Sequence, residues 1–244
     1  MPFFCFYVKM TIEVKMKKIK EWAYRDKRIF AEGLSGTKLY VIYIIGSIFG
    51  VYFEQVRNLI KSLINNGTWF WEYRRGLIYG PFNPLYGFGA MILVWLLLRK
   101  PLSNLKTFIY GSLIGGIVEY LVSFLQETFT GTTSWDYTGF IGNINGRTNI
   151  PYMLVWGLLA FILVKVIYPF VSKLIEKIPY NVGRLCVNCM HVFMFVNCFL
   201  SFGAIIRWNF RHQGMKPFSF LGKFFDKVYP DNFLIKHYPN MKFR

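Results

Sequence analysis

The chain has 244 residues, of which 54% are apolar and 20% aromatic, and its formal net charge is +17. With a mean hydropathy of +0.34, this composition excludes an ordinary soluble domain and indicates a membrane protein. In a soluble protein the positive charge would favour nucleic acid as partner. Here the basic clusters flank hydrophobic segments, so we expect contact with a lipid bilayer containing anionic headgroups, and no nucleic acid.

The sequence begins with a basic head, residues 1–38, in which "KMKKIK" and "YRDKR" are interspersed with aromatic side chains. This segment lacks an uncharged hydrophobic core, so it does not resemble a cleavable signal peptide. We expect the head to remain in the cytoplasm and to lie against the membrane surface.

Five windows of roughly 20 mostly apolar residues follow, which is the length that a helix needs to cross a bilayer. Period-two alternation is absent, and the windows are too long for strands. We therefore predict an all-α, polytopic transmembrane helix bundle of about five helices over residues 39–206, in the cell membrane. The windows run from about Leu39 to Ile60, Phe82 to Leu98, Thr107 to Leu125, Pro151 to Pro169, and Leu185 to Ile206.

The second window contains the sequence "YGPFNPLYGFG", residues 79–89, which is dense in proline and glycine. Pro81 and Pro84 lack an amide hydrogen and disfavour helix at the preceding residue, while the glycines permit close backbone approach. We predict a broken or re-entrant start of this helix. Such backbone is tolerated at membrane depth where it is buried in protein or lines a wet cavity, which is where transporters place their sites.

Part of the sequence occurs twice. The stretch "GSIFGVYFE" at 46–54 is similar to "GSLIGGIVE" at 111–119, and "GTWFWEY" at 67–73 is similar to "GTTSWDY" at 131–137. We interpret the copies as helix-loop-helix units over 39–98 and 107–169, related by a pseudo-two-fold axis along the membrane normal. Chance similarity between apolar helices is the alternative.

A glutamate inside the apolar window ends each copy of the first motif, Glu54 in one and Glu119 in the other. At about 100° per residue, these carboxylates share a helix face with small and polar residues, which suits helix contact rather than lipid. We expect the two faces to meet and hold the carboxylates close together, so that they share a proton or bind a cation. The alternative is that protonated glutamates only link the helices. The faces comprise Gly46 and Gly50 in the first copy, and Ser112, Gly115, Gly116, Ser123 and Gln126 in the second.

A second acidic layer is predicted at the outer mouth of the bundle. Glu72 and Asp136 each lie between Trp and Tyr, residues that favour the membrane interface, and Arg75 and Arg147 follow them. The guanidinium groups can pair with these acids, or clamp a carboxylate or phosphate. A surface salt bridge that only fixes the loop is the more common outcome.

The distribution of Lys and Arg predicts the orientation in the membrane. Nine precede the first window, eight lie in the basic, aromatic tail at 207–244, and Arg147 is the only one in the long third loop. The positive-inside rule therefore places the head and the short second and fourth loops in the cytoplasm, and the third loop outside. With five crossings the basic tail would also lie outside, so either the tail is translocated or one crossing is re-entrant.

Three stretches carry a resemblance to a known family: "RRGLIYGPFNPLYGFGA" at 74–90, "VEYLVSFLQE" at 118–127 and "WDYTGFIGNINGRTNIPYMLVWG" at 135–157. Over roughly residues 40–206 the chain resembles the bacterial family of multi-pass, permease-like proteins named putative ABC-transporter type IV. The resemblance implies a transport role. Its motif positions are Arg75, Gly80, Pro81, Pro84, Tyr86, Gly87, Gly89, Glu119, Trp135, Asp136, Tyr137, Asn145, Gly146 and Arg147.

Nucleotide and metal sites are not predicted. The sequence has no glycine-rich nucleotide-binding loop, so an ATP-driven mechanism would need a separate ATPase or other membrane subunit. Cys186, Cys189 and His191 form a C-x-x-C-x-H string without a second ligand pair. We therefore expect no metal and no cofactor.

Three hypotheses about function follow, of which an enzyme is not the favoured one. A permease-like component would pass a small solute or ion along the repeat axis, with intramembrane carboxylates on its path. An integral membrane enzyme would act on a lipid or lipid-linked phosphate, with Arg75 and Arg147 holding the phosphate and Asp136 or Glu72 as acid-base group. A non-catalytic membrane subunit is the third. The candidate pathway residues are Glu54, Glu72, Tyr86, Arg75, Glu119, Trp135, Asp136, Tyr137, Asn145 and Arg147.

Overall fold

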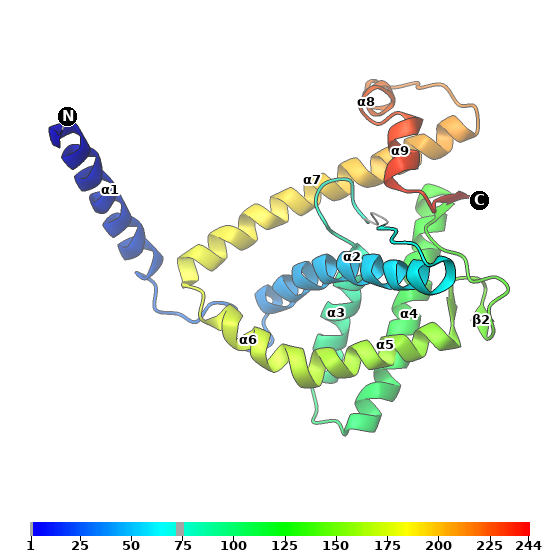
Figure 1. Cartoon of the computed structure of the whole chain (residues 1–244), viewed down its shortest axis with the longest axis horizontal. Helices are drawn as coiled ribbons and strands as arrows, with labels where there is room; N and C mark the ends of the chain where they lie inside the picture. The colour runs from blue at the N-terminus through cyan, green and yellow to red at the C-terminus, as the bar shows by residue number, and fades with distance from the viewer. Residues whose placement is uncertain (1, 72–75) are drawn as a thin grey trace.

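The computed structural model describes residues 2–71 and 76–244, with side chains from residue 12 onward. It confirms the all-α prediction (Figure 1). Two short antiparallel strand pairs join β1 (Thr132–Thr133) to β4 (Lys242–Phe243) and β2 (Asn143–Ile144) to β3 (Thr148–Asn149). The helices are α1 (Pro2–Ala23), α2 (Gly36–Asn66), α3 (Pro84–Leu97), α4 (Asn104–Thr130), α5 (Ile150–Ile162), α6 (Tyr168–Glu176), α7 (Tyr180–His212), α8 (Phe220–Val228) and α9 (Asp231–His237).

Four helical stretches in the described residues are long and apolar enough to cross a membrane: α2, α4, α5 together with α6, and α7. Each contains one of the predicted windows. The remaining window forms α3, whose 14 residues extend only about 21 Å, short of a bilayer core of about 30 Å. The described chain thus combines four full-length helices with one half-length helix.

The helix ends follow local sequence rules. Ser35 and Ser103 cap the N-termini of α2 and α4 by accepting hydrogen bonds from backbone amides in the first turn. Gly67 and Gly131 end the same two helices in the left-handed conformation, at φ +63° and +65°, which a residue with a Cβ rarely adopts. The two helices therefore begin and end in the same way.

The half-length helix α3 begins inside the bundle. The side chain of Asn83 accepts a hydrogen bond from the Leu85 amide, and Pro84 occupies the first turn, where no amide donor is needed. The Asn83 amide donates to the carbonyl of Ser47, 3.0 Å away and well within α2. The N-terminus of α3 is therefore level with the interior of a membrane-spanning helix.

The segment before α3, residues 76–83, is non-helical, and α7 satisfies its backbone. The Ile78 amide donates to Ser201 Oγ at 2.9 Å. The side chain of Asn197 accepts from the Tyr79 amide at 3.1 Å and donates to the Tyr79 carbonyl at 2.7 Å. The predicted broken start of this helix is confirmed. Polar side chains of α7 form the hydrogen bonds that the non-helical backbone cannot form within a helix.

Glycines let successive helices pack closely. A Cβ added at Gly46 of α2 would lie 2.6 Å from the Cβ of Ala90 in α3, and one added at Gly111 of α4 would collide with Ala160 in α5. The prediction that the small-residue faces of α2 and α4 meet each other is therefore wrong. Each face packs instead on the next helix along the chain, α3 for α2 and α5 for α4, because glycine allows that antiparallel neighbour to approach.

The third full-length helix contains a π-helical turn at Leu163–Ile167, two residues before Pro169. Pro169 has no amide hydrogen, and in a regular α-helix its ring would clash with the Lys165 carbonyl, so the wider turn relieves that clash. The helix bends there (Figure 1). Lys165 donates to the Leu102 carbonyl at 2.6 Å, in the connection between α3 and α4.

A buried lysine links α2 to α6. Lys38 is fully inaccessible, and its Nζ lies 2.7 Å from Glu176 Oε1 and 2.5 Å from Ser172 Oγ. Replacing Glu176 by glutamine leaves the lysine charge uncompensated inside the protein. We expect the unfolding free energy to fall by about 2 kcal/mol. This is less than the loss for a fully buried ion pair, because the Glu176 side chain is 32% exposed.

Thermal unfolding of the purified protein in detergent measures this loss. The control is Glu32→Gln, which makes the same substitution at an exposed position near the same end of α2. Equal melting temperatures for the two variants would contradict the role of the pair.

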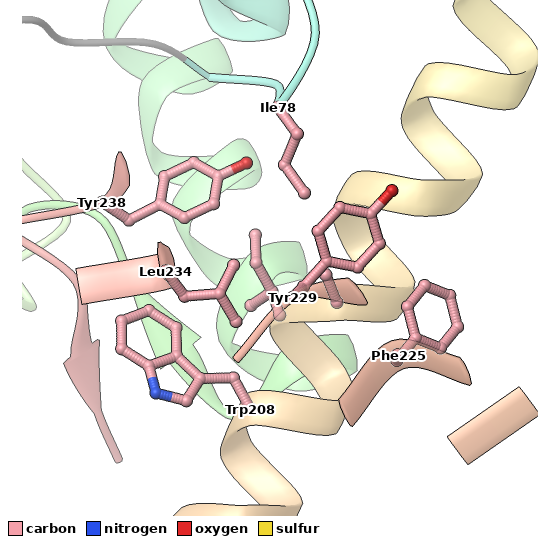
Figure 2. Packing of buried hydrophobic residues seen from close by; sticks show 8 residues of the cluster. Ile78, Trp208, Phe225, Tyr229, Leu234 and Tyr238 are labelled. Carbon is pink, nitrogen blue, oxygen red and sulfur yellow. The ribbon is translucent and has the colours of Figure 1, made fainter. Parts of the chain in front are cut away.

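The tail folds back on α7. Figure 2 shows Phe225, Tyr229, Leu234 and Tyr238 of the tail packed with Trp208 of α7 and with Ile78, and this cluster is buried. The head contacts the other end of α7, where Asn181 donates to the Trp22 carbonyl at 2.7 Å. Head and tail therefore lie at opposite ends of the bundle (Figure 1).

Candidate functional site

A cavity of about 1020 Å³ lies between α2, α3, α4, α5, α7 and the tail. This volume is at the upper end of the range for small-molecule sites. Asn83, Pro84 and Leu85 form part of the wall, so the cavity reaches the depth at which the half-length helix α3 begins. The charged side chains of the described wall are Glu54, Arg57, Glu119, Asp136 and Lys242, with His237 as a further titratable group.

Six of the ten predicted pathway residues line this cavity, and they come from four separate regions of the chain. Two others, Asn145 and Arg147, lie outside its wall. The last two, Glu72 and Arg75, fall outside the described residues. The six are Glu54, Tyr86, Glu119, Trp135, Asp136 and Tyr137.

Glu119 of α4 is buried, with 4% of its surface exposed, and two hydroxyl groups bind it. Tyr137 donates to Oε1 at 2.9 Å, and Thr148 of β3 donates to Oε2 at 2.8 Å. Burial and the charge of Glu119 hold the pKa of the Tyr137 phenol far above its usual range, so the phenol remains a donor. The loop 131–149 thus folds over the carboxylate and orients it.

Aromatic and cationic contacts extend from this carboxylate to α2. The ring of Tyr137 stacks on that of Tyr152, with centroids 4.8 Å apart. Arg57 donates from Nη1 to the Tyr152 hydroxyl at 3.0 Å. Glu54 lies one helical turn before Arg57 and also lines the cavity. Both intramembrane carboxylates therefore line the same cavity.

Glycines also set the position of two large rings in the wall. Gly50 leaves room for Tyr86 of α3, and Gly115 leaves room for Trp156 of α5, since a Cβ at either glycine would collide with the ring residue. The two rings meet with centroids 5.4 Å apart. Glycines at matching places in the similar stretches 46–54 and 111–119 thus bring Tyr86 and Trp156 together at the cavity.

Asp136 lies at the mouth of the cavity, where the tail returns to the bundle. Arg244 donates to Asp136 Oδ2 at 3.2 Å, and Lys242 Nζ lies 3.5 Å from the same oxygen. Hydrogen bonds from Thr138 and the charges of Lys242 and Arg244 lower the pKa of Asp136 to about 2. The tail is therefore joined to this loop by charge as well as by the β1–β4 pairing.

Of the roles considered for Arg147, pairing with Asp136 is not found, and the structure shows a salt bridge that fixes the loop. Arg147 Nη1 lies 2.6 Å from Glu127 Oε2, and its guanidinium lies over the rings of Tyr120 and Phe124 at 5.7 and 5.4 Å. These three partners follow one another along one face of α4, because helix residues three and four apart are neighbours. Arg147 thus fixes the loop to α4 instead of facing the cavity.

Asn145 and Trp135 have related structural roles. The Asn145 amide donates to the Tyr120 hydroxyl at 3.0 Å, and Trp135 Nε1 donates to the Arg147 carbonyl at 2.8 Å. Asn145 has a positive φ of 51°, and Gly146 follows at 68°, so the chain makes a tight turn there. Of Trp135, Asn145, Gly146 and Arg147, only Trp135 lines the cavity.

Sequence analysis missed several wall residues. Arg57 could have been found from the sequence. It is a charged residue inside an apolar window, three residues from Glu54, and burying a charge in a membrane costs free energy, so such a residue is usually functional. Tyr152 and Trp156 gave no such signal, and neither did Thr148, which binds Glu119 without lining the cavity, because aromatic and threonine side chains are ordinary in a membrane helix or its connections. The tail residues gave none either, since their return to the cavity depends on tertiary packing.

Residues 2–71 and 76–244 contain no group of three or more His, Cys, Asp or Glu placed to hold a metal ion. Cys186 and Cys189 are exposed on α7. His191 hydrogen-bonds the Val187 carbonyl through Nδ1 at 2.8 Å and stacks on Tyr40 with ring centroids 3.7 Å apart. His191 is thus held by its own helix and by Tyr40 of α2, and the two cysteines are on the exposed surface of α7.

The family model described as "Putative ABC-transporter type IV" matches residues 41–202, about two thirds of the chain. The chain belongs to this family. The family match covers the five apolar windows except for their outermost residues, and it leaves out the head and the tail. Neither the curated proteins nor the solved structures contain a match to the chain. Family membership and the four long apolar helices together make it a membrane protein related to transport.

Proposed function

We propose that this protein is a permease-like component of a transport system that passes a small solute or ion through the cavity, with Glu54 and Glu119 on its path. The observation that carries the proposal is a carboxylate buried in a large cavity beside the start of a half-length helix. Transporters bind substrates and coupling ions at interrupted helices of this kind, near mid-membrane. Burying an ionisable group inside a membrane costs free energy, and the few such groups that occur mostly line substrate or ion pathways.

We also infer that residues 39–98 and 107–169 are two copies of one unit. In support, α2 and α4 share serine N-caps and left-handed glycine C-caps, and each meets the next helix along the chain through a glycine against an alanine. Such a repeat would give the cavity a pseudo-two-fold axis, with Glu54 and Glu119 at equivalent positions. The path would then follow that axis.

The orientation that we propose has the basic head, residues 1–38, in the cytoplasm and the membrane domain over 39–206. The positive-inside rule favours this side for the head. The tail, 207–244, lies at the other end of the bundle and would then face outward. Its basic side chains are partly compensated there, because Arg207 and Arg211 pair with Asp226 and Asp136 pairs with two bases of the tail.

A separate ATPase chain is the partner that we propose if transport uses ATP, because the sequence has no nucleotide-binding loop. The lipid-phosphate enzyme has less support than the permease. Its proposed clamp needs Arg147 near a substrate, and Arg147 is held by Glu127 outside the cavity wall. A non-catalytic subunit remains compatible with the fold, and a partner that co-purifies in stoichiometric amount would favour it.

Currents in proteoliposomes on a solid-supported membrane test the proposal. A panel of inorganic cations, amines and amino acids is applied to the wild type, with any co-purifying ATPase retained and ATP supplied. We expect at least one solute to evoke a saturable current, and Glu119→Gln to reduce it by about tenfold or more, because glutamine keeps the shape of the side chain but removes its charge.

Glu32→Gln is the matched control, since it makes the same change at an exposed position outside the cavity wall. It should retain the current at equal reconstituted amounts. The proposal fails if no solute evokes a current, or if Glu119→Gln carries the wild-type current.

A further inference from the structure

An apolar groove of about 500 Å³ lies between α7 and α8, separate from the cavity of the proposed path. Six phenylalanines belong to its described lining, and Arg207 is the single charged residue there. The groove and the cavity share Phe202 and Ile206 of α7, so this helix divides them. The groove therefore lies outside the proposed solute path.

The groove follows the apolar part of α7 to its polar end. Its α7 wall extends from Phe195 to Phe210, about 22 Å at a rise of about 1.5 Å per residue, whereas half of a bilayer core is about 15 Å. From Leu185 to Ile206 the sequence has no Lys, Arg, Asp or Glu, and Arg207 follows. The groove thus extends from the hydrocarbon region to the level at which α7 leaves it.

The helix α8 packs on this part of α7 through one face. A Cβ added at Gly203 of α7 would collide with the ring of Phe225. Phe220 and Phe224 lie on another face of α8, at least about 100° around the helix from Phe225, and both are exposed, Phe220 to 87%. A helix with one face on the protein and an apolar face exposed is suited to the membrane interface.

Basic side chains flank the exposed face of α8. Lys223 and Lys227 lie on this helix and Lys216 precedes it; all three are exposed, and none forms an ion pair within the described residues. Arg207 Nη1 donates to the Met215 carbonyl at 2.9 Å, which holds the neighbouring Lys216 near the polar end of the groove. Positive charge is therefore available where the apolar lining ends.

We propose that the groove binds an anionic phospholipid of the surrounding bilayer, with one acyl chain between the phenylalanines of α7 and α8 and the headgroup phosphate at Lys216. An acyl chain suits this lining because it needs no hydrogen-bond partners, and the lysines attract a negatively charged headgroup. The groove opens beside Phe195 and Phe199, which are exposed within the apolar stretch of α7, so a lipid reaches it directly from the bilayer. The lipid site does not depend on solute transport through the cavity.

Photo-crosslinking of the wild-type chain tests for this lipid. The full chain is reconstituted in phosphatidylcholine vesicles with a constant trace of phosphatidylglycerol that carries a diazirine in one acyl chain, and mass spectrometry locates the label. Unlabelled phosphatidylglycerol then replaces part of the phosphatidylcholine. We expect labelling of the groove to fall about fivefold or more, because the unlabelled lipid competes for one site. Labelling of the exposed apolar surface of α2, which includes Phe49 and Ile60, should stay constant.

Two results would overturn the proposal. An equal response of α2 and the groove would show only ordinary contact with bulk lipid. Labelling of α2 without labelling of the groove would show that protein covers the groove, for example a second copy of the chain.

Variants separate the headgroup contact from the acyl-chain contact. Lys216→Gln should raise about fivefold the amount of phosphatidylglycerol that halves groove labelling. The matched control is Lys236→Gln, an exposed lysine of α9 outside the groove lining, which should leave this amount unchanged. Gly222→Leu adds a side chain to the groove wall, where a Cβ meets no atom closer than 3.3 Å, and should reduce groove labelling about fivefold.

Equal competition in Lys216→Gln and Lys236→Gln would overturn the headgroup contact. Unchanged groove labelling in Gly222→Leu would overturn the position of the acyl chain.

Discussion

Replacing Gly111 by alanine is expected to lower the unfolding free energy by about 3 kcal/mol, the upper part of the range for overpacking a well-packed interior. The new methyl group would collide with the Cβ of Ala160, which is fixed to the α5 backbone and cannot rotate away. α4 and α5 would have to separate along their contact. Melting temperature in detergent, together with the monodisperse fraction in gel filtration, measures the loss.

The same contact provides a rescue. Ala160→Gly removes the obstructing methyl group, so the double variant Gly111→Ala with Ala160→Gly should recover most of the lost stability. Gly116→Ala should cost less than Gly111→Ala, because its new Cβ meets the flexible side chain of Met153, and Gly36→Ala meets nothing within 4 Å. If the double variant melts no higher than Gly111→Ala, the collision is not the cause.

Much of the fold follows from the sequence because membrane helices are governed by length and hydropathy. Four predicted windows lie inside the four long helices, and the proline and glycine of residues 79–89 mark the broken start of α3. The pairing of the helices was wrong, since small residues at 46 and 111 indicate a close contact but not with which helix. Partner choice depends on connection length and on shapes such as Ala90 and Ala160.

The site was predictable to the extent that charge inside a membrane is costly. Glu54 and Glu119 were predicted as pathway residues for this reason, and both line the cavity. Arg147 was misplaced, because a guanidinium near the interface can pair with any nearby acid, and the turn at Asn145 carries it to Glu127 on α4. The contribution of the tail was not visible, since an amphipathic, basic segment equally fits a membrane surface.

Asp226→Asn is expected to release α8 from α7. Arg207 is buried, and it holds Asp226 in two-pronged fashion, Nε to Oδ1 and Nη2 to Oδ2, both at 2.9 Å. Arg211 also donates to Asp226 at 2.5 Å. The substitution removes the charge and turns one of the two acceptor oxygens into an amide nitrogen. The buried Arg207 guanidinium then has only neutral acceptors among the described residues, such as the Met215 carbonyl at 2.9 Å, so the local stability of this contact should fall by about 3 kcal/mol.

Limited trypsin digestion reports this release, because cleavage after Lys223 or Lys227 requires the helix to open. At a loss of about 3 kcal/mol the open population, and with it the cleavage rate, should rise about a hundredfold. Asp231→Asn is the matched control: the Asp231 side chain is 51% exposed and pairs with Arg211 at 2.6 Å, so its loss should cost no more than about 1 kcal/mol. Similar cleavage rates in the two variants would mean that α8 is held by the packing of Phe225 against Gly203 and not by charge. If charge does hold it, the residues from His237 to Lys242 that wall the cavity depend on Asp226 for their position.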